Sequence, residues 1–378
     1  MNNECKDIIL LTPSLTRAGQ EKVVYELAKG FKSKSLNVEV VSFYAGPFKK
    51  LLENLNIPVV LLDNRSKFTL IKSFYNLLKS KKKYVFVFHG LGFEKIWLFF
   101  SLLNFRMPKS FFVFHNNYPF FTDKKLYFKK SLLRFFLKKI NTYIFIKKSI
   151  LDLALESKIV FEAKKCFVIE NGISNLSKII DEKKLIKLRN NLDLDQSDFV
   201  ILQVGRFVPQ KNQLMSIKAV EKLIKRYSNI KLIFAGEGPL FIECQKYVEI
   251  NNLKENILFK GNVPNIDQYL NVSNLFIMPS FFEGHPISLI EAIMMKVPSV
   301  VFDSPGINSF FTRDIDCLHY CDLKNHLSLS KTILNLFLKI SQKDYDDFKL
   351  NKCSEWCCDN YSSKKMISMY LNVLNNNI

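Results

Sequence analysis

The 378-residue chain has no apolar stretch that approaches 18 uncharged residues, so a membrane-spanning helix is not expected. Its N-terminus, Met-Asn-Asn-Glu-Cys-Lys-Asp, runs directly into an apolar segment at residues 8–11 without the pattern of a secretory signal peptide. The sequence therefore predicts a protein that stays in the cytosol.

Cysteine is sparse, with eight residues scattered along the chain. Without an export signal these are expected to be reduced thiols. Cys317 and Cys321 lie near His319 and His326, but their spacings match no common zinc frame, and no metal site is predicted.

Acidic residues are scarce in the first half of the chain. Residues 1–175 hold 30 Lys and Arg against 13 Asp and Glu, a net charge of +17, whereas residues 176–378 hold 25 against 22, a net of +3. This asymmetry predicts an anionic partner for the first half. The residues alone do not distinguish between membrane phospholipid, nucleic acid and an anionic substrate.

Apolar strands alternate with amphipathic helices through both halves. Predicted strands are 7–12, 38–43, 57–62, 84–89, 111–115, 143–146, 199–204, 230–235, 257–260, 274–278 and 298–302. Predicted helices are 19–33, 47–55, 68–80, 94–103, 124–139, 149–157, 211–227, 239–250, 265–271, 287–296 and 324–340. This alternation indicates an α/β protein with two doubly wound parallel sheets, joined by the charged segment 176–198 with one short helix. Ligands in such folds bind beyond the carboxyl ends of the strands.

Glu283 and Glu291 are the most informative pair in the chain. Glu283 follows the buried strand that ends near residue 278, and Gly284 and Pro286 then mark a tight turn into a helix. A helix N-terminus attracts an anion, and carboxylates on either side of it can accept hydrogen bonds from hydroxyl groups. The pattern fits the sugar and ribose hydroxyls around a diphosphate.

Basic and glycine-bearing turns follow other predicted strands. Arg206 and Lys211 come after strand 199–204, where two cations near a helix start favour a bound phosphate. Gly19, in Arg17-Ala18-Gly19-Gln20-Glu21, allows close approach of the backbone to a phosphate or sugar. The turns 236–239 and 259–264 expose main chain that can bond to a nucleobase edge.

Two of the five histidines share one topological position. His89 ends strand 84–89, and His115 ends strand 111–115 and precedes Asn116-Asn117. A histidine at the carboxyl end of a buried strand is placed to donate to a sugar hydroxyl or to accept a proton.

With these residues the chain resembles the retaining GT-B glycosyltransferases, in particular the Glu-x7-Glu family of bacterial lipopolysaccharide, O-antigen and capsule assembly (glycosyl transferases group 1, family 4). The resemblance covers nearly the whole chain. Its motifs are the first glycine turn, Asn171-Gly172-Ile173, Gly205-Arg206 with Lys211-Asn212, Gly236-Glu237-Gly238-Pro239, Gly261-Asn262-Val263, and Pro279-Ser280 before Glu283-Gly284.

The resemblance implies a GT-B fold in which two Rossmann-like domains face a central cleft. Residues 1–175 would form a basic, membrane-facing acceptor domain, and residues 176–355 would form the nucleotide-sugar domain. Residues 356–378, beginning at Trp356, would form a helix that crosses back to the first domain.

It also implies roles for individual residues. Arg206 and Lys211 would bind the donor diphosphate with the backbone of Ile287 and Ser288, while Gly19 would lie beside it. The remaining implied contacts are Glu291 with the ribose, Val263 with the base, Glu283 and the Gly284–His285 backbone with the donor hexose, His115 with the sugar near the reacting carbon, and His89 with the acceptor.

Relatives of this kind use Arg, Lys and a helix dipole in place of a metal, so no cofactor is expected. The chain departs from the family pattern at Ala18-Gly19, where many relatives carry two glycines, and at His285, where an aromatic residue or leucine is commoner. His285 leaves the identity of the donor sugar open.

The segment Lys124–Lys139 interleaves Phe and Leu with seven basic residues, the composition of a helix that lies on anionic lipid, and residues 67–83 repeat this theme more weakly. The predicted function is a retaining, metal-independent hexosyltransferase, peripheral on the inner face of the plasma membrane. It would move a hexose or N-acetylhexosamine from a nucleotide sugar, UDP-linked, to a lipid-linked saccharide acceptor. The alternatives are a GT-B nucleotide-sugar 2-epimerase and a non-enzymatic basic nucleic-acid-binding protein; no nucleic-acid module is recognised.

Overall fold

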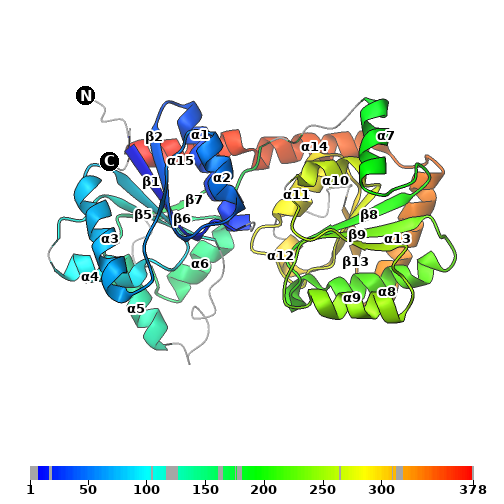
Figure 1. Ribbon diagram of the computed structural model, residues 1–378, viewed down its shortest axis with the longest axis horizontal. Coiled ribbons are helices and arrows are strands. Elements are labelled where there is room, and N and C mark those ends of the chain that lie inside the picture. Colours follow the sequence, from blue (N-terminus) through cyan, green and yellow to red (C-terminus); the bar gives the residue numbers. More distant parts are fainter. Residues whose placement is uncertain are drawn as a thin grey trace. The chain divides into compact units, whose positions relative to one another are not determined.

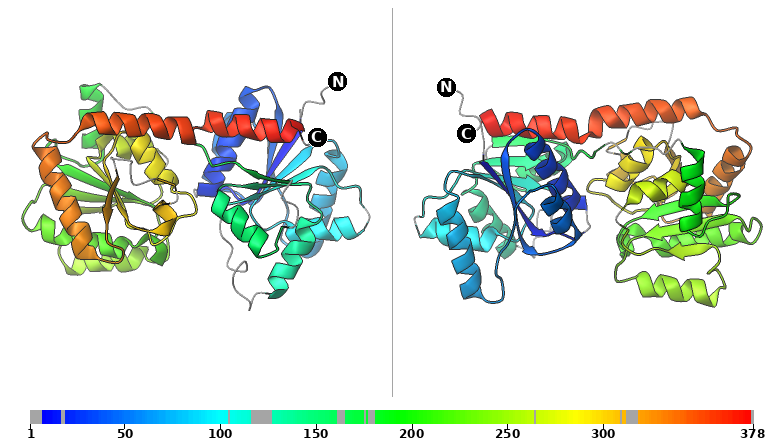
Figure 2. Two further views of the ribbon diagram at one scale, coloured as in Figure 1. Left: turned by 180° about the vertical axis from the view of Figure 1, so that it is seen from behind. Right: turned by 45° about the horizontal axis from the view of Figure 1, so that its top comes forward.

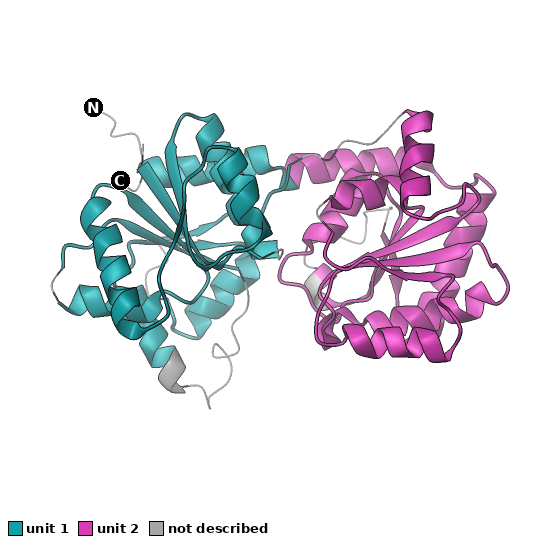
Figure 3. Cartoon of the chain, viewed as in Figure 1, with its two compact units in different colours: residues 1–174, 361–378 teal, residues 175–360 magenta. Residues whose placement is uncertain are grey.

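The computed structural model describes residues 7–16, 19–103, 105–115, 127–160, 165–174, 176, 181–263, 265–308, 310–311 and 318–376, without the side chains of 127–129, 305 and 306. It forms two compact units (Figure 3). Unit 1 comprises residues 1–174 and 361–378, and unit 2 comprises residues 175–360. The chain thus leaves unit 1 and returns to it at Tyr361, whereas the sequence divides it after residues 175 and 355.

Unit 1 is built on a seven-stranded parallel sheet with the order β3-β2-β1-β4-β5-β6-β7. Its strands are β1 (Asp7–Ser14), β2 (Asn37–Tyr44), β3 (Val59–Leu61), β4 (Val85–His89), β5 (Ser110–Phe114), β6 (Thr142–Phe145) and β7 (Cys166–Val168). Its helices are α1 (Gly19–Ser33), α2 (Pro47–Asn54), α3 (Lys67–Ser80), α4 (Glu94–Leu102), α5 (Tyr127–Leu137), α6 (Lys148–Glu156) and α15 (Ser363–Asn376) (Figure 1).

Unit 2 repeats this plan with a six-stranded parallel sheet of order β10-β9-β8-β11-β12-β13. Its strands are β8 (Phe199–Val204), β9 (Ile230–Ala235), β10 (Ile257–Phe259), β11 (Leu275–Met278), β12 (Ser299–Phe302) and β13 (Leu318–Cys321). Its helices are α7 (Glu182–Asn191), the 3₁₀ turn η4 (Pro209–Lys211), α8 (Gln213–Ile224), α9 (Phe241–Ile250), α10 (Ile266–Val272), α11 (Ile287–Met294), α12 (Pro305–Asn308), α13 (His326–Ser341) and most of α14 (Asp347–Tyr361).

The prediction of an α/β protein with two Rossmann-like parallel sheets is confirmed, because helices flank both sheets (Figure 2) and every strand pairing described is parallel. The central strands β4 and β5 are buried along their whole length, which explains their almost uninterrupted apolar sequences. Strands β7 and β13 were not predicted. Each is a short edge strand with half-buried positions, and so lacks the apolar run that identifies a central strand.

Aromatic side chains fix two helices of unit 1 against one region of its sheet. The Phe88 ring on β4 contacts the Trp97 ring of α4 at a centroid distance of 4.8 Å and the Phe136 ring of α5 at 5.9 Å. Phe112 on β5 also meets Phe136, at 5.5 Å. The apolar side of α5 is therefore part of the core. In the described part of the chain, no helix combines the length and the apolar character needed to span a bilayer.

The returning segment docks on unit 1 through backbone contacts. Ile173 and Ser362 form a parallel bridge, and the Ser363 N–H donates to the Ile173 carbonyl at 2.7 Å. The backbone of Gly172 lies so close to this segment that a Cβ atom there would be 2.2 Å from the Ser362 oxygen. Only glycine fits at this position.

Gly172→Ala is expected to lower the free energy of unfolding by about 1–3 kcal/mol, because the backbone of Ser362 has to move to admit the methyl group. Thermal unfolding and limited proteolysis after residue 360 would measure the loss. Lys364→Ala, an exposed change on the same segment, is the control and is expected to stay within about 0.5 kcal/mol of the parent. Equal stability of the two variants would refute this account.

Candidate functional site

The strand order of unit 2 reverses between β8 and β11. From β8 the chain proceeds to β9 on one side, and β11 lies on the other side of β8. The loops that follow these two strands then diverge, which opens a crevice at their carboxyl ends where α/β proteins bind ligands. The segments Gly205–Lys211 and Phe281–Glu283 both lie at this switch point.

Three interactions join these two loops. The Gln210 side chain donates to the Phe282 carbonyl at 2.5 Å, and the Phe281 N–H donates to the Gln210 carbonyl at 2.9 Å. The Lys211 ammonium contacts Glu283 Oε1 at 2.6 Å, with side-chain exposures of 19% and 6%. The structure thus brings together a cation predicted to bind diphosphate and a carboxylate predicted to bind the hexose.

Two buried glutamines donate hydrogen bonds to the backbone of the Lys211 loop. Gln203 on β8 donates to the Lys211 carbonyl at 2.8 Å, and Gln213 at the start of α8 donates to the Arg206 carbonyl at 3.0 Å. Asn212, between η4 and α8, takes a left-handed conformation with φ 59°. Sequence reasoning missed both glutamines; for Gln203 the available signal was a glutamine inside an otherwise apolar strand, whereas Gln213, in a helix, gave no such signal.

Arg206 differs from Lys211 in its exposure and in its partners. It is exposed, and among the residues that the structure describes it makes no ion pair. A guanidinium that is free in this way presents its full set of donors to an anion, whereas the Lys211 ammonium already gives one of its three donors to Glu283.

A close-packed set of strand-end turns forms the neighbouring part of the site. Gly236 follows β9 with φ 145°, and a Cβ there would lie 2.2 Å from the Gly205 carbonyl oxygen. Its N–H donates to the Gly261 carbonyl at 2.7 Å. Beyond these glycines, Asn262 donates to Glu237 at 2.8 Å, and Val263 is half-buried. The predicted base-binding turns therefore pack side by side.

Helix α11 carries the second glutamate. Glu291 is 3% exposed, within the helix. At the helix start, the Ile287 N–H donates to the His285 carbonyl at 2.9 Å. The Ser288 N–H is in the first turn of the helix, where N–H groups have no acceptor within the helix. The His285 ring meets Phe310 edge-on at a centroid distance of 4.9 Å. Gly284 is half-buried between Glu283 and His285.

Unit 1 holds a buried pair of histidines at the carboxyl ends of the adjacent strands β4 and β5. His89 ends β4, His115 follows β5, and His89 Nδ1 lies 3.0 Å from His115 Nε2. Their exposures are 0% and 4%. His89, which the sequence assigns to the acceptor, thus has no exposed surface, and its ring contact is with His115.

The pair has a defined chemical character. Burial lowers the pKa of His115 to about 3, and burial together with the neighbouring His115 lowers the pKa of His89 well below its ordinary value. Both rings are therefore neutral at pH 7, with one proton between them. Among the described residues, His89 Nε2 and His115 Nδ1 have no hydrogen-bond partner. Whichever ring donates the shared proton, one of these outer nitrogens is a donor and the other an acceptor.

The first turn of α1 completes this region. Gly19 is exposed at the start of the helix, and Gln20 donates to the His89 carbonyl at 2.7 Å. Glu21, which the sequence analysis assigned no role, is buried; desolvation raises its pKa although Ser14 donates to it at 2.8 Å. Some residues of the predicted motifs lie outside the described part of the chain: Arg17, Ala18, Asn116, Asn117, Lys124, Lys125, Pro264 and Cys317.

Comparisons with known proteins agree on one class. Residues 186–346 match the family model described as Glycosyl transferases group 1. The capsular polysaccharide biosynthesis glycosyltransferase CapH of Staphylococcus aureus is 28% identical over 332 residues, which cover 83% of this chain and 86% of CapH. The UDP-Gal:alpha-D-GlcNAc-diphosphoundecaprenol alpha-1,3-galactosyltransferase of Escherichia coli is 30% identical over 156 residues, 40% of each protein.

The match to four further relatives spans only 33% to 57% of the length of each of those proteins. Among solved structures, Anabaena Alr3699/HepE in complex with UDP and glucose superimposes with a TM-score of 0.81 at 17% identity, over 98% of this chain and 99% of that one. This likeness concerns the fold.

The buried ion pair of unit 2 leads to a stability prediction. Lys211→Met leaves the Glu283 carboxylate buried without its partner, and is expected to cost about 3 kcal/mol of unfolding free energy in urea. Adding Glu283→Gln should restore most of that loss. Lys254→Met breaks the exposed pair with Glu249 and serves as the matched control, with a cost below about 1 kcal/mol. Equal costs for the two lysines would contradict a buried pair.

The histidine pair leads to a pH prediction. Unfolded histidine binds a proton near its ordinary pKa of about 6.5, whereas folded His115 binds one only near pH 3, so the unfolded state holds more protons between these values. The contribution of His115 to the free energy of unfolding is therefore fully present above pH 6.5. It falls as the pH drops, by up to about 1.4 kcal/mol per pH unit. His115→Asn should show a shallower loss of unfolding free energy from pH 7 to 4. Parallel curves for the variant and the parent would exclude a buried neutral imidazole.

Proposed function

We propose that the chain, which has the GT-B fold and matches the model of group 1 glycosyl transferases over residues 186–346, is a retaining enzyme of bacterial surface-polysaccharide assembly. It transfers a hexose or N-acetylhexosamine from a UDP-sugar to a lipid-linked saccharide acceptor. The products of this class are O-antigen, lipopolysaccharide and capsule.

The arrangement of Arg206, Lys211 and Glu283 carries the proposal. The exposed guanidinium of Arg206 and the ammonium of Lys211 follow β8, and the Glu283 carboxylate meets Lys211 from the loop after β11. A sugar diphosphate needs cations at its phosphates and an acceptor for sugar hydroxyls a few ångströms away. The ion pair holds both groups in place before the donor binds, which lowers the cost of ordering them.

Departure of UDP places negative charge on the diphosphate. Arg206, Lys211 and the start of α11 at Ser288 neutralise this charge, so the proposed reaction uses no metal. In the same proposal Glu291 holds the ribose and Val263 meets the base through its main chain. An acceptor hydroxyl attacks the anomeric carbon of the donor sugar on the same face from which UDP departs. The departing diphosphate takes the proton of that hydroxyl.

The neutral histidine pair suits contact with a sugar. His115 Nδ1 is an outer nitrogen of the pair, and in the tautomer that carries its proton there it donates to a donor-sugar hydroxyl near the reacting carbon. A neutral ring does so without adding a positive charge beside the anomeric centre.

The printed names of relatives support the choice of substrates. The E. coli relative is named for UDP-galactose and a diphosphoundecaprenol acceptor, and the HepE structure holds UDP and glucose. We extend the UDP-linked donor and the lipid-linked acceptor to this chain, with a position on the inner face of the plasma membrane.

A thermal-shift screen of UDP, GDP, ADP and their sugars tests the donor site. UDP is expected to raise the melting temperature without added metal. Arg206→Ala should weaken UDP binding at least about tenfold, because a charge-assisted contact to phosphate is lost. Glu283→Gln should retain UDP and lose transfer. Glu243→Gln, an exposed change on α9, is the control for both.

Release of UDP only when acceptor is present would separate transfer from epimerisation. A parent protein that no nucleotide stabilises, or a Glu283→Gln variant that retains most transfer, would overturn the assignment of the donor site.

A further inference from the structure

One face of unit 1 exposes apolar side chains far beyond what its core requires. Between α3 and α4 lies an apolar cavity of about 450 Å³, a size within the range of about 300–1,000 Å³ seen for ligand pockets. Its walls include Phe68, Phe99 and Leu103, which are 75%, 41% and 63% exposed. Leu102 at the end of α4 is 61% exposed. Contiguous apolar exposure of this kind marks a binding surface.

Both helices have separate apolar sides for the core and for this face. Helix α3 buries Phe74, Leu77 and Leu78, and α4 buries Ile96 and Trp97. Phe68 and Phe99 lie on the remaining sides of these helices, and Leu103 directly follows α4. Phe100 also lines the cavity, but it is buried and its ring meets that of Phe74 at a centroid distance of 5.9 Å.

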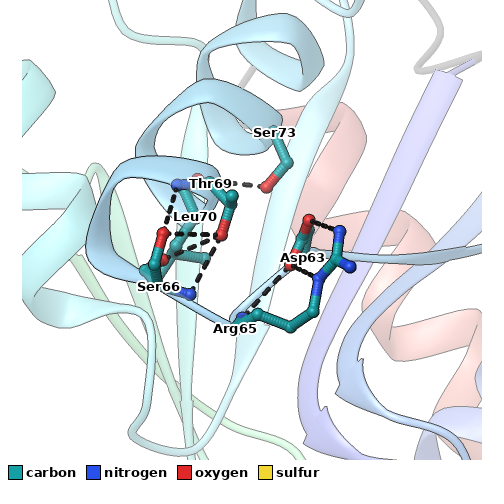
Figure 4. A network of polar contacts seen from close by, with 6 residues as sticks. All are labelled: Asp63, Arg65, Ser66, Thr69, Leu70 and Ser73. Atoms are coloured by element: carbon teal, nitrogen blue, oxygen red, sulfur yellow. Dashed lines mark hydrogen bonds and ion pairs between the residues drawn. The ribbon is translucent and has the colours of Figure 1, made fainter.

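The face is held in a fixed shape. Ser66 caps α3: the Thr69 N–H donates to its hydroxyl at 3.1 Å, and the Ser66 N–H donates to the Thr69 hydroxyl at 3.0 Å (Figure 4). Arg65 pairs with Asp63 at 2.7 Å just before this cap. Across the cavity, the Phe100 ring contacts those of Tyr75 and Phe105 at centroid distances of 6.2 and 5.8 Å.

The surroundings of the cavity are strongly cationic. Residues 64–110 contain ten Lys and Arg and one acidic residue, Glu94. Two of the ten are neutralised, since Arg65 pairs with Asp63 and Lys81 with Glu39. Seven exposed cations remain, on the two helices and in the segments that directly follow them: Lys67, Lys72, Lys79, Lys82, Lys83, Lys95 and Arg106.

Helix α5, the stronger candidate by sequence for contact with lipid, buries most of the apolar side chains that the structure describes in it. Its Leu133, Phe136 and Leu137 are 3%, 0% and 1% exposed. Phe135 alone among its described large apolar residues is exposed, at 43%. The cationic side of this helix remains, but its apolar side packs on the sheet.

We propose that the α3–α4 face docks unit 1 on an anionic phospholipid bilayer. Phe68, Phe99 and Leu103 insert among the acyl chains, and the surrounding lysines contact the headgroups. A cationic rim around an apolar centre is complementary to such a surface. A second copy of this face fits poorly, because two equally cationic rims would repel each other. The proposal adds to the proposed function the surface that brings the enzyme to a lipid-linked acceptor.

Cosedimentation of the full chain with phosphatidylcholine vesicles, with and without phosphatidylglycerol, tests it. The parent is expected to bind only the anionic vesicles. Phe68→Ser with Leu103→Ser should reduce the partition coefficient at least about tenfold, because two inserted side chains are lost. Phe348→Ser is the matched control: Phe348 is equally exposed, at 75%, but lies on α14 in unit 2, and its loss should leave binding unchanged.

Charge is tested separately by Lys72→Gln with Lys79→Gln, which should weaken binding by roughly fivefold for each lysine removed. Stabilisation by UDP should be unchanged in all of these variants, so failure of the donor site and failure of membrane docking are distinguishable.

Equal binding of the Phe68/Leu103 variant and the parent would overturn the proposal, as would absence of parent binding to anionic vesicles at low salt. A parent that dimerises without vesicles, and a Phe68/Leu103 variant that does not, would instead assign this face to contact between copies.

Discussion

Parallel pairing of the strands is the constraint on which the rest of this structure depends. Because every strand described in each sheet runs in the same direction, all carboxyl ends lie along one edge, and the reversal of order beside β1 and β8 separates neighbouring loops there. Residues that are far apart in the chain are thereby brought together. Lys211 and Glu283 are joined in unit 2, and His89 and His115 in unit 1, through this topology.

The polar groups at these edges are held by other buried polar groups. Gln203 and Gln213 each use a side-chain amide to fix the backbone of the Lys211 loop, and Gln20 does the same for the carbonyl of His89. A buried amide left without a partner is costly, so each bond strongly favours one loop conformation. These sites are therefore shaped before a substrate arrives. Arg206, exposed beside this ordered loop, is the group left to respond to the ligand.

The positive charge of the first half indicates a lipid-binding surface only where exposed apolar residues accompany it. Two helices of unit 1 combine Phe and Leu with lysine. In α5, Phe136 meets Phe88 and Phe112 of the sheet and is buried with Leu133 and Leu137, whereas α3 and α4 keep several apolar residues exposed. The same composition thus serves the core in one helix and the surface in another.

Much of this protein follows from its sequence. Apolar runs and strand–turn–helix patterns determined the α/β class, the two sheets and most element positions, because local periodicity encodes burial. They also marked Glu283, Arg206 and Lys211 as residues at strand ends. Three features were decided by the tertiary structure: the Lys211–Glu283 contact, the union of His89 with His115, and the burial of the apolar side of α5. Each depends on which strands become neighbours and which face a helix turns inward, and these choices rest on packing between distant segments that no local pattern contains.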